Sequence, residues 1–320
     1  MITVSGFAIE AVFGCVPAQA TDNYTVTAAL AGAEKARGIV EAPGFPVRRS
    51  VAPGTTVLDL MLPAARRALD GVDPQAIGGV VAVSFSAPDR FPALAAQLQQ
   101  ALNLPTHIAA LDLGLACSGY PYGLMVAGQL AAATGRRVLL VDGDVQSAHV
   151  DVEDVNTLAV MSDAASATLV APSGAGARFA FLTQGALGDV LRCPAAGVIR
   201  MNGFGVFRFV ATEVTAFLRE FQAQTAVTPD FFVPHQANMY MVRQLAKSLG
   251  LESRLLTSGP KFANPGSCSV PLTLAAGGFP TDANGAADMN VLLAAFGAGL
   301  SAAAALLPVS SAIRRGVVEI

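Results

Sequence analysis

The sequence predicts an α/β protein built from two similar halves that pack as one body. Apolar, β-branched segments alternate along the chain with segments of helical periodicity. A weak internal repeat is also present, because ACSGYPYGLMVAG (116–128) is matched by SCSVPLTLAAGG (267–278), each following a loop and opening a predicted helix. A Gly/Ala/Ser/Pro patch at 172–177 separates patterned segments, so we expect halves at 1–172 and 173–320.

The first half contains strand–helix–strand units with short connections, which is typical of parallel sheets. Valine content and flanking glycines mark the strands, whereas periodic apolar residues mark the helices. Pro63 interrupts one predicted helix, and Gly135 ends another. The predicted strands are Ile2–Val12, Gly78–Ser86, Ile108–Leu113 and Arg137–Gly143, and the predicted helices are Thr25–Lys35, Thr56–Leu69, Pro92–Leu102 and Ser118–Thr134.

The second half repeats this alternation and contains the longest apolar run of the chain. That run, Val291–Leu307, carries no charge and is close to the minimum length of a membrane span. Gly297 and Gly299 divide it, which favours two short strands joined by a tight turn. The other predicted elements are helices at Val206–Gln222, Ala237–Leu249 and Val270–Ala276, and strands at Asp230–Val233 and Met289–Gly297.

The N-terminal segment VSGFAIEAVFGC (4–15) has the apolar character of an export signal. It lacks a basic region, and Glu10 interrupts its apolar stretch, so we interpret it as a strand. With no membrane span expected, the hydrophobic share of 53% and the charged share of 13% favour a tight homodimer that hides surface. A net charge of −3 provides no basic field for nucleic acid.

The four cysteines are widely scattered and form no C-x-x-C pair. This spacing argues against a disulfide framework or a zinc site, so we expect no metal and a reduced, cytoplasmic setting. Cys117 is distinctive because it lies where a predicted strand ends and a predicted helix begins. Unpaired N–H groups and the helix dipole favour a thiolate there, while the structural alternative is a small buried hydrophobe.

A nucleophilic cysteine needs partners, and the chain has three histidines. His107 and His149 lie in polar stretches, so we expect them to be solvated or to form local hydrogen bonds. His235 also lies at a strand-to-helix junction, directly after a proline, and Asn264 lies in the loop KFANPGS. Cysteine, histidine and asparagine at such junctions suit thiol chemistry supported by hydrogen-bond donors.

Four motifs occur in order along most of the chain: LGLACSGYPYGL, VPHQAN, NPGSCSVPL and FGAGLS. Together they resemble the β-ketoacyl-[acyl-carrier-protein] synthase III family of the thiolase fold. The resemblance implies a thiolase-like body with layers in the order αβαβα. It also implies that Cys117, His235 and Asn264 are catalytic.

The reaction implied by the resemblance is a decarboxylative Claisen condensation that needs no cofactor. Cys117 takes the acyl group of a thioester, and the backbone N–H groups of Cys117 and Ala298 form the oxyanion hole. A malonyl thioester loses carbon dioxide, and His235 and Asn264 stabilise the enolate that attacks the acyl group to give a 3-oxoacyl thioester. One alternative is an acyltransferase that acylates an alcohol or amine from the same intermediate. Another is a non-catalytic partner subunit of a condensing heterodimer.

The resemblance places two phenylalanines at the substrate. Phe91 matches a position that crosses the dimer to line the neighbour's acyl pocket, although an ordinary core phenylalanine is the plain alternative. Phe207 matches a substrate-binding position in the segment MNGFGVFRFV.

The chain also departs from the family pattern, as divergent members of secondary pathways do. It has no tryptophan to stack an adenine, Asn156 stands where an arginine is usual, and Tyr240 replaces a basic docking residue. These changes favour an acyl carrier protein over coenzyme A as the donor. Arg243 and Lys247 are four residues apart, therefore on one helix face, and we expect them to dock an acidic carrier.

Overall fold

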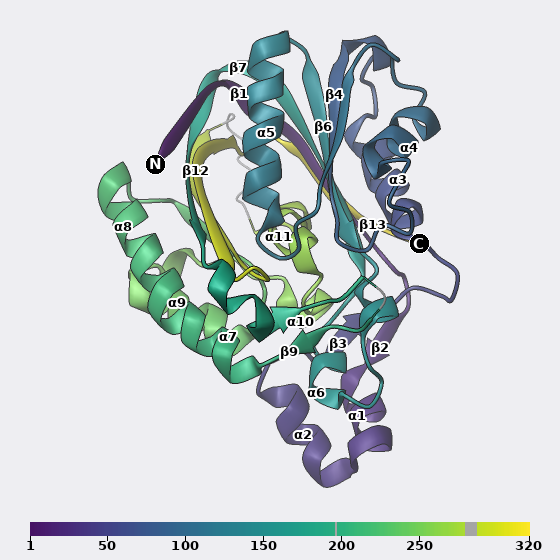
Figure 1. Ribbon diagram of the computed structural model, residues 1–320. Coiled ribbons are helices and arrows are strands. Elements are labelled where there is room, and N and C mark those ends of the chain that lie inside the picture. The colour runs from purple at the N-terminus through teal and green to yellow at the C-terminus, as the bar shows by residue number, and fades with distance from the viewer. Residues whose placement is uncertain (196, 279–286) are drawn as a thin grey trace.

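The computed structural model describes residues 1–195, 197–278 and 287–320 and arranges them in five alternating layers of helices and strands (Figure 1). Two helices lie in the central layer, and two more cover each outer face. The expected layered α/β architecture is confirmed. The outer helices are α3 (Val57–Ala68) and α4 (Leu94–Ala101) on one side and α8 (Thr215–Thr225) and α9 (Met239–Leu249) on the other, with α5 (Gly119–Thr134) and α11 (Ser269–Ala276) between the sheets.

The two sheet layers share the long strands β1 (Ile2–Val16) and β7 (Ala164–Thr183). The first part of β7 pairs with β6, its last part pairs with β12, and β1 pairs with most of its length. The hydrogen-bonded order is β10-β11-β12-β7-β6-β4-β5, and β13 joins the free side of β1 in parallel. The further strands are β4 (Ile77–Val83), β5 (Ala109–Leu113), β6 (Arg137–Asp144), β10 (Phe231–Pro234), β11 (Asp288–Gly297), β12 (Ser301–Ser310) and β13 (Arg314–Glu319).

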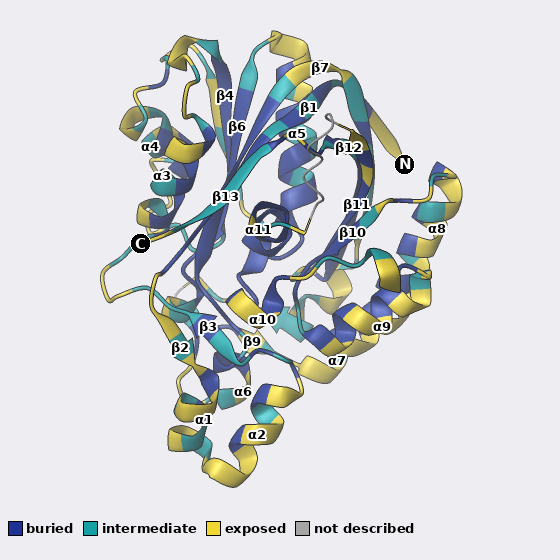
Figure 2. Cartoon of the chain, turned by 180° about the vertical axis from the view of Figure 1, so that it is seen from behind, coloured by how far each residue is buried: buried dark blue, intermediate teal, exposed yellow. Residues whose placement is uncertain are grey.

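Strand alternation sends side chains into the spaces on both faces of each sheet. On β6, Val138 and Leu140 pack in the central layer, whereas Leu139 and Val141 pack under α3 and α4. A separate cluster around Phe221 and Phe296 lies under α8 and α9. Figure 2 shows the consequence, with buried strands and central helices inside and exposed residues on the outer helices.

Most predicted elements are present, and the internal repeat has a structural meaning. Cys117 immediately precedes the cap of α5 and Cys268 is the cap of α11, so the two similar motifs open the two helices of the central layer. The predicted βαβ unit is also confirmed, because β5 and β6 both run parallel to β4 on its two sides.

Two predicted helices differ from the structure. The helix expected at Thr25–Lys35 is divided at Gly32, whose φ of 87° ends α1 (Asn23–Ala31) before α2 (Ala33–Glu41) begins. The helix expected at Val206–Gln222 begins earlier, as α7 (Gly203–Phe209), and continues through a π-helical turn at Val210–Val214 into α8.

The segment 172–177 does not separate two halves as a linker would. It lies inside β7, where Pro172 and Gly176 pair with Phe7 and Ser5 of β1. Small residues at this point allow close approach of the strands, since a Cβ at Gly176 would lie 2.4 Å from the Val4 carbonyl oxygen.

The long apolar segment forms strands β11 and β12, which pair as an antiparallel hairpin. The N-terminal apolar segment forms β1. Among the described residues, no helix has the length and apolarity to cross a membrane.

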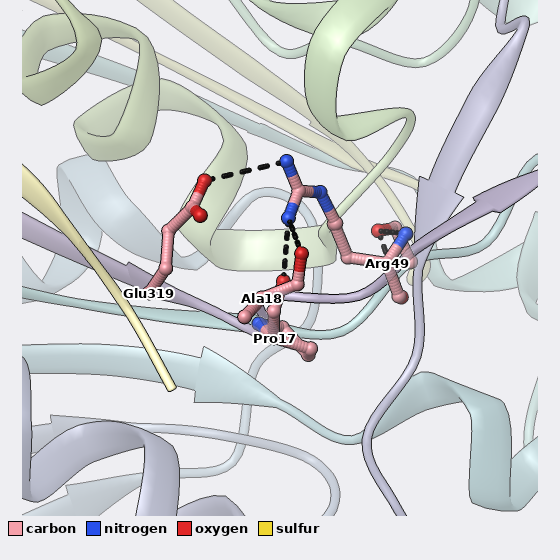
Figure 3. Close-up of polar contacts among 5 residues, drawn as sticks. Pro17, Ala18, Arg49 and Glu319 are labelled. Atoms are coloured by element: carbon pink, nitrogen blue, oxygen red, sulfur yellow. Dashed lines mark hydrogen bonds and ion pairs between the residues drawn. The ribbon is translucent and has the colours of Figure 1, made fainter.

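A smaller region below the sheets carries the remaining elements and is tied to the core by Arg49 (Figure 3). The Arg49 guanidinium donates to the carbonyl oxygens of Pro17 and Ala18 at 2.7 and 2.6 Å and approaches Glu319 at 3.4 Å. The elements of this region and its surroundings are β2 (Ala20–Asp22), β3 (Val47–Arg49), α6 (Val155–Leu158), β8 (Leu191–Arg192), β9 (Arg200–Met201) and α10 (Gly259–Phe262).

Candidate active site

Cys117 lies at the end of the loop that joins β5 to α5 and is 7% exposed. Its surroundings are tight, because a Cβ on Gly297 would lie 2.6 Å from the Cys117 Cβ. Only glycine therefore fits at position 297. Among the cavities that the described residues form, one of about 140 Å³ and one of about 330 Å³ both reach Cys117.

The smaller cavity brings Cys117, His235 and Asn264 together, as the sequence predicted. His235 follows β10, whose last residue is Pro234, and its backbone N–H donates to the Ala294 carbonyl oxygen at 2.7 Å. Asn264 lies between α10 and α11 in a loop whose backbone hydrogen bonds to Val160 and Ser162. Three segments that are far apart in the sequence thus supply one site.

A hydrogen bond with Ser269 sets the tautomer of His235. The Ser269 Oγ lies 2.6 Å from His235 Nδ1 and also accepts the backbone N–H of Gln236 at 3.4 Å. A hydroxyl has two lone pairs and one hydrogen, and among the described residues Nδ1 is the acceptor within reach of that hydrogen, so we assign the hydrogen to the bond with Nδ1. Burial lowers the pKa of His235 to about 3, so the ring is neutral and carries its one hydrogen on Nε2.

A second local bond orients the Asn264 carboxamide. Its Oδ1 accepts the backbone N–H of Gly266 at 3.0 Å, and its Nδ2 has no partner among the described residues. The two hydrogens of Nδ2 are thus available to a ligand in the cavity that Asn264 lines. The smaller cavity consequently offers Cys117 two neutral N–H donors, one from a ring and one from an amide.

The turn after β11 carries Ala298 and is linked to the Cys117 loop. Ser301 Oγ donates to the Ala298 carbonyl oxygen at 2.8 Å and lies 2.7 Å from Ser118 Oγ. Within the described part of the chain, neither the Cys117 nor the Ala298 backbone N–H donates to another residue. Both residues line the larger cavity, where their N–H groups can serve a ligand oxygen.

The carboxylate of Asp144, at the end of β6, holds the neighbouring loops. It accepts the hydroxyls of Ser84 and Ser86 and the backbone N–H groups of Phe85 and Ser86 at 2.9–3.2 Å. Its other oxygen accepts the Ser267 hydroxyl at 3.3 Å. Burial raises the pKa of Asp144 to about 7, although these hydrogen bonds lower it.

The expectation of a resting thiolate at Cys117 is wrong. Burial, together with the Asp144 carboxylate, raises the pKa of the Cys117 thiol to about 12, while the backbone N–H of Cys117 itself lowers it. Desolvation of the sulfur therefore outweighs the helix N-terminus that the sequence pointed to. Cys117 is a neutral thiol in the free protein.

The other predicted site residues lie on the surface. Phe91 is 84% exposed and Phe207 is 36% exposed, and neither lines the two cavities at Cys117. Phe207 stacks instead on Tyr240, with ring centroids 6.3 Å apart. Arg243 and Lys247 are both exposed on α9, as the helical spacing predicted.

Sequence reasoning missed several residues of the site. Ser269 orients His235, Gln146 donates to the carbonyl oxygens of Ser162 and Asn264, and His149 lines the larger cavity. Ser269 follows the predicted Asn264 loop closely, which is the one signal that pointed to it. No signal in the sequence pointed to Gln146 or His149, because their contacts arise between segments far apart in the sequence.

Comparisons with known proteins agree with this geometry. The family model described as 3-oxoacyl-[acyl-carrier-protein (ACP)] synthase III matches residues 111–188, and the model of its C-terminal part matches residues 224–309. The chain is 32% identical over 308 residues to beta-ketoacyl-[acyl-carrier-protein] synthase III 2 of Streptomyces coelicolor, covering 93% of this chain and 92% of that protein. It is 29% identical over 311 residues to the Shewanella oneidensis synthase III, covering 91% and 96%.

A solved structure is similar over the whole chain. The 3-oxoacyl-(acyl-carrier protein) synthase of Burkholderia xenovorans superimposes with a TM-score of 0.93 at 27% identity, covering 100% of this chain and 98% of that one. The layered arrangement of this chain is therefore also that of a solved synthase.

The pKa of Cys117 leads to a pH prediction. Below a pKa of about 12 the thiolate fraction grows about tenfold per pH unit, so alkylation of Cys117 by iodoacetamide should rise about tenfold per unit from pH 7 to 9 without a plateau. Peptide mapping separates Cys117 from the exposed Cys193, and a Cys193→Ser variant is the control. A rate that levels off above pH 8 would show a stabilised thiolate instead.

Proposed function

The chain belongs to the 3-oxoacyl-[acyl-carrier-protein] synthase III family, and from this premise we propose that it joins a Cys117-bound acyl group to a malonyl thioester by decarboxylative condensation. The observation that carries the proposal is the pair of neutral N–H donors, His235 Nε2 and Asn264 Nδ2, in the cavity that reaches the thiol. Such donors stabilise a negative oxygen that exists only during the reaction.

Acyl transfer to the enzyme is the first step. The Cys117 sulfur bonds to the acyl carbon, the donor thiol leaves, and the proton of Cys117 ends on that leaving thiol. The tetrahedral intermediate carries a negative oxygen, which the backbone N–H groups of Cys117 and Ala298 stabilise. The Ser118–Ser301 hydrogen bond supports this arrangement because it connects the two loops that present these N–H groups.

Condensation is the second step. The bond to the malonyl carboxylate breaks, carbon dioxide leaves, and the electron pair forms an enolate whose oxygen is held by His235 and Asn264. The enolate carbon then attacks the acyl carbon, and Cys117 departs as a thiolate that takes a proton from solvent water. Its high pKa favours this reprotonation. The product is a 3-oxoacyl thioester.

Simple acyl transfer to a hydroxyl group is less well supported. It would use His235 as a general base, which requires a free lone pair on Nε2. The bond from Ser269 leaves a hydrogen on that nitrogen instead, and the pKa of about 3 means that the ring resists taking up a second proton.

The proposed donor of the substrates is an acyl carrier protein. Residues of α7 and α9 line the smaller cavity, and the exposed side chains beside it include Arg243 and Lys247, which form no ion pair among the described residues. Free positive charges on one face suit an acidic carrier. The Phe207–Tyr240 stack lies where these two helices meet, so we place it within the docking surface rather than in the acyl site.

We also propose a homodimer formed through β5. This strand is at the end of the hydrogen-bonded order, and its apolar residues Ala109 and Ala110 are exposed. An open apolar edge is a template for pairing with another strand, and a second copy would supply it. Phe91, exposed on a nearby loop of the same half, would then be buried by the partner.

The donor pair is tested by measuring two steps separately. His235→Ala and Asn264→Ala should each lower carbon dioxide release from a malonyl thioester roughly ten- to thousand-fold, because each removes one enolate donor. Acylation of Cys117 should persist, since the backbone donors remain. His107→Ala, exposed and outside both cavities, is the control. Carbon dioxide release unaffected by both site variants, or none from the parent, would contradict condensation.

The docking surface is tested by charge reversal. The double variant Arg243→Glu/Lys247→Glu should raise KM for a carrier-protein thioester several-fold at low salt, and the effect should shrink at high salt. A pantetheine-sized thioester, which lacks the carrier, should be unaffected. Equal KM values for parent and variant at low salt would place the carrier elsewhere.

The dimer is tested by mass in solution. Light scattering at micromolar concentration should give twice the mass of one chain, and Ala110→Lys, which puts a charge on the edge of β5, should shift the protein toward monomer. A parent that stays monomeric argues against the β5 interface.

A further inference from the structure

The larger cavity reaches Cys117 from a different side than the catalytic donors do. Its volume is about 330 Å³, and neither His235 nor Asn264 lines it. That volume is at the lower end of small-molecule sites. An acyl group on Cys117, with its oxygen on the N–H groups of Cys117 and Ala298, has this space for its chain.

The wall of this cavity is not purely apolar. Phe85, Leu115, Met161 and similar residues form one part, as a hydrocarbon chain requires. A 3₁₀ turn at Gln146–His149 forms another part and presents its first and last side chains to the cavity. Residues three apart in a 3₁₀ turn lie on one side of the turn, and both of these polar residues line the same cavity.

The imidazole ring of His149 makes no hydrogen bond within the described residues. The ring packs against Phe85, with centroids 5.6 Å apart and the planes tilted by 54°. The backbone is fixed as well, because the His149 carbonyl oxygen accepts the Ile199 N–H at 2.7 Å. Within the described residues neither ring nitrogen has a hydrogen-bond or ion-pair partner, so the ring offers an N–H donor to a ligand.

Gln146 contributes a hydrogen-bond acceptor. It is 2% exposed, and its Nε2 donates to the carbonyl oxygens of Ser162 and Asn264, both at 2.7 Å. These two bonds use both amide hydrogens and define the orientation of the carboxamide. Its Oε1 has no partner in the described part of the chain, so it remains an acceptor.

A donor beside an acceptor fits a hydroxyl group, which can accept from one and donate to the other. A carboxylate fits less well, because it would face the Gln146 oxygen and find no unpaired cation among the described residues that line the cavity. Arg192, the basic residue of this wall, is paired with Asp189 at 3.0 Å and has a side chain 55% exposed to solvent.

We propose that the larger cavity selects an acyl group that carries a hydroxyl on its chain, held between His149 and Gln146. This inference rests on the proposed function, in which Cys117 takes the acyl group. A plain alkyl chain of the same length would leave a buried oxygen acceptor without a partner, which disfavours it.

The test compares acylation of Cys117 by matched thioesters of N-acetylcysteamine, followed by intact-protein mass spectrometry. The set is hexanoyl, its 3-, 4-, 5- and 6-hydroxy derivatives, and 5-carboxypentanoyl. The parent should take one hydroxy derivative about tenfold faster than hexanoyl, the effect expected of one to two hydrogen bonds.

Two variants locate the source of that preference. His149→Phe retains a ring against Phe85 but removes both nitrogens, so the ratio of hydroxyacyl to hexanoyl rates should fall to about one. His107→Phe makes the same change at an exposed histidine outside the cavity and should leave the ratio as in the parent.

Three results overturn the inference while leaving the proposed function intact: hexanoyl equals every hydroxy derivative, the carboxylated chain reacts fastest, or His149→Phe keeps the parent ratio. Failure of every thioester to acylate Cys117 would instead overturn the proposed function, and this inference with it.

Discussion

The buried carboxylate of Asp144 is the interaction on which the arrangement of the site depends. It receives hydrogen bonds from the loop after β4 and from the loop that precedes α11. The first loop carries Phe85, against which His149 packs, and the second carries Asn264 and leads into Ser269. A buried carboxyl group in this position without its hydrogen-bond donors would be unfavourable, so Asp144 favours the observed positions of both loops. The Asp144 side chain therefore holds together two loops that contribute to the walls of both cavities.

The reacting groups themselves are uncharged in the free protein. Burial keeps Cys117 as a thiol and His235 as a neutral ring, and Asn264 has no charge to lose. Their directions are set instead by neighbours: Ser269 for His235, Gly266 for Asn264, and the Ser118–Ser301 pair for the Ala298 turn. Donors held in advance gain strength when charge develops on the substrate in a low-dielectric space, and they cost little reorganisation at that moment.

The sequence allowed the layered fold and the residues Cys117, His235 and Asn264 to be predicted, because each residue lies in a loop that leads into a helix and within a distinct motif. The features that the sequence did not predict depend on tertiary contacts. A helix N-terminus suggests a thiolate at Cys117, but only the structure reveals the desolvation that outweighs it. The segment 172–177 has the composition of a linker, yet pairing with β1 makes it part of a strand. His149 and Gln146 are ordinary polar residues until the chain brings them beside Cys117.

The pairing of β1 with β13 has a consequence for folding of the chain during its synthesis on the ribosome. Ala11 lies opposite Arg314 in a parallel ladder, so a strand made at the start of synthesis waits for one made about 300 residues later. Until then one edge of β1, rich in buried apolar residues such as Val12 and Val16, stays uncovered. Ladders of such long sequence separation form slowly and leave nascent chains prone to aggregation. The sheet is thus completed only after β13 has been synthesised, which makes β1 the part of the fold that stays exposed longest on one edge.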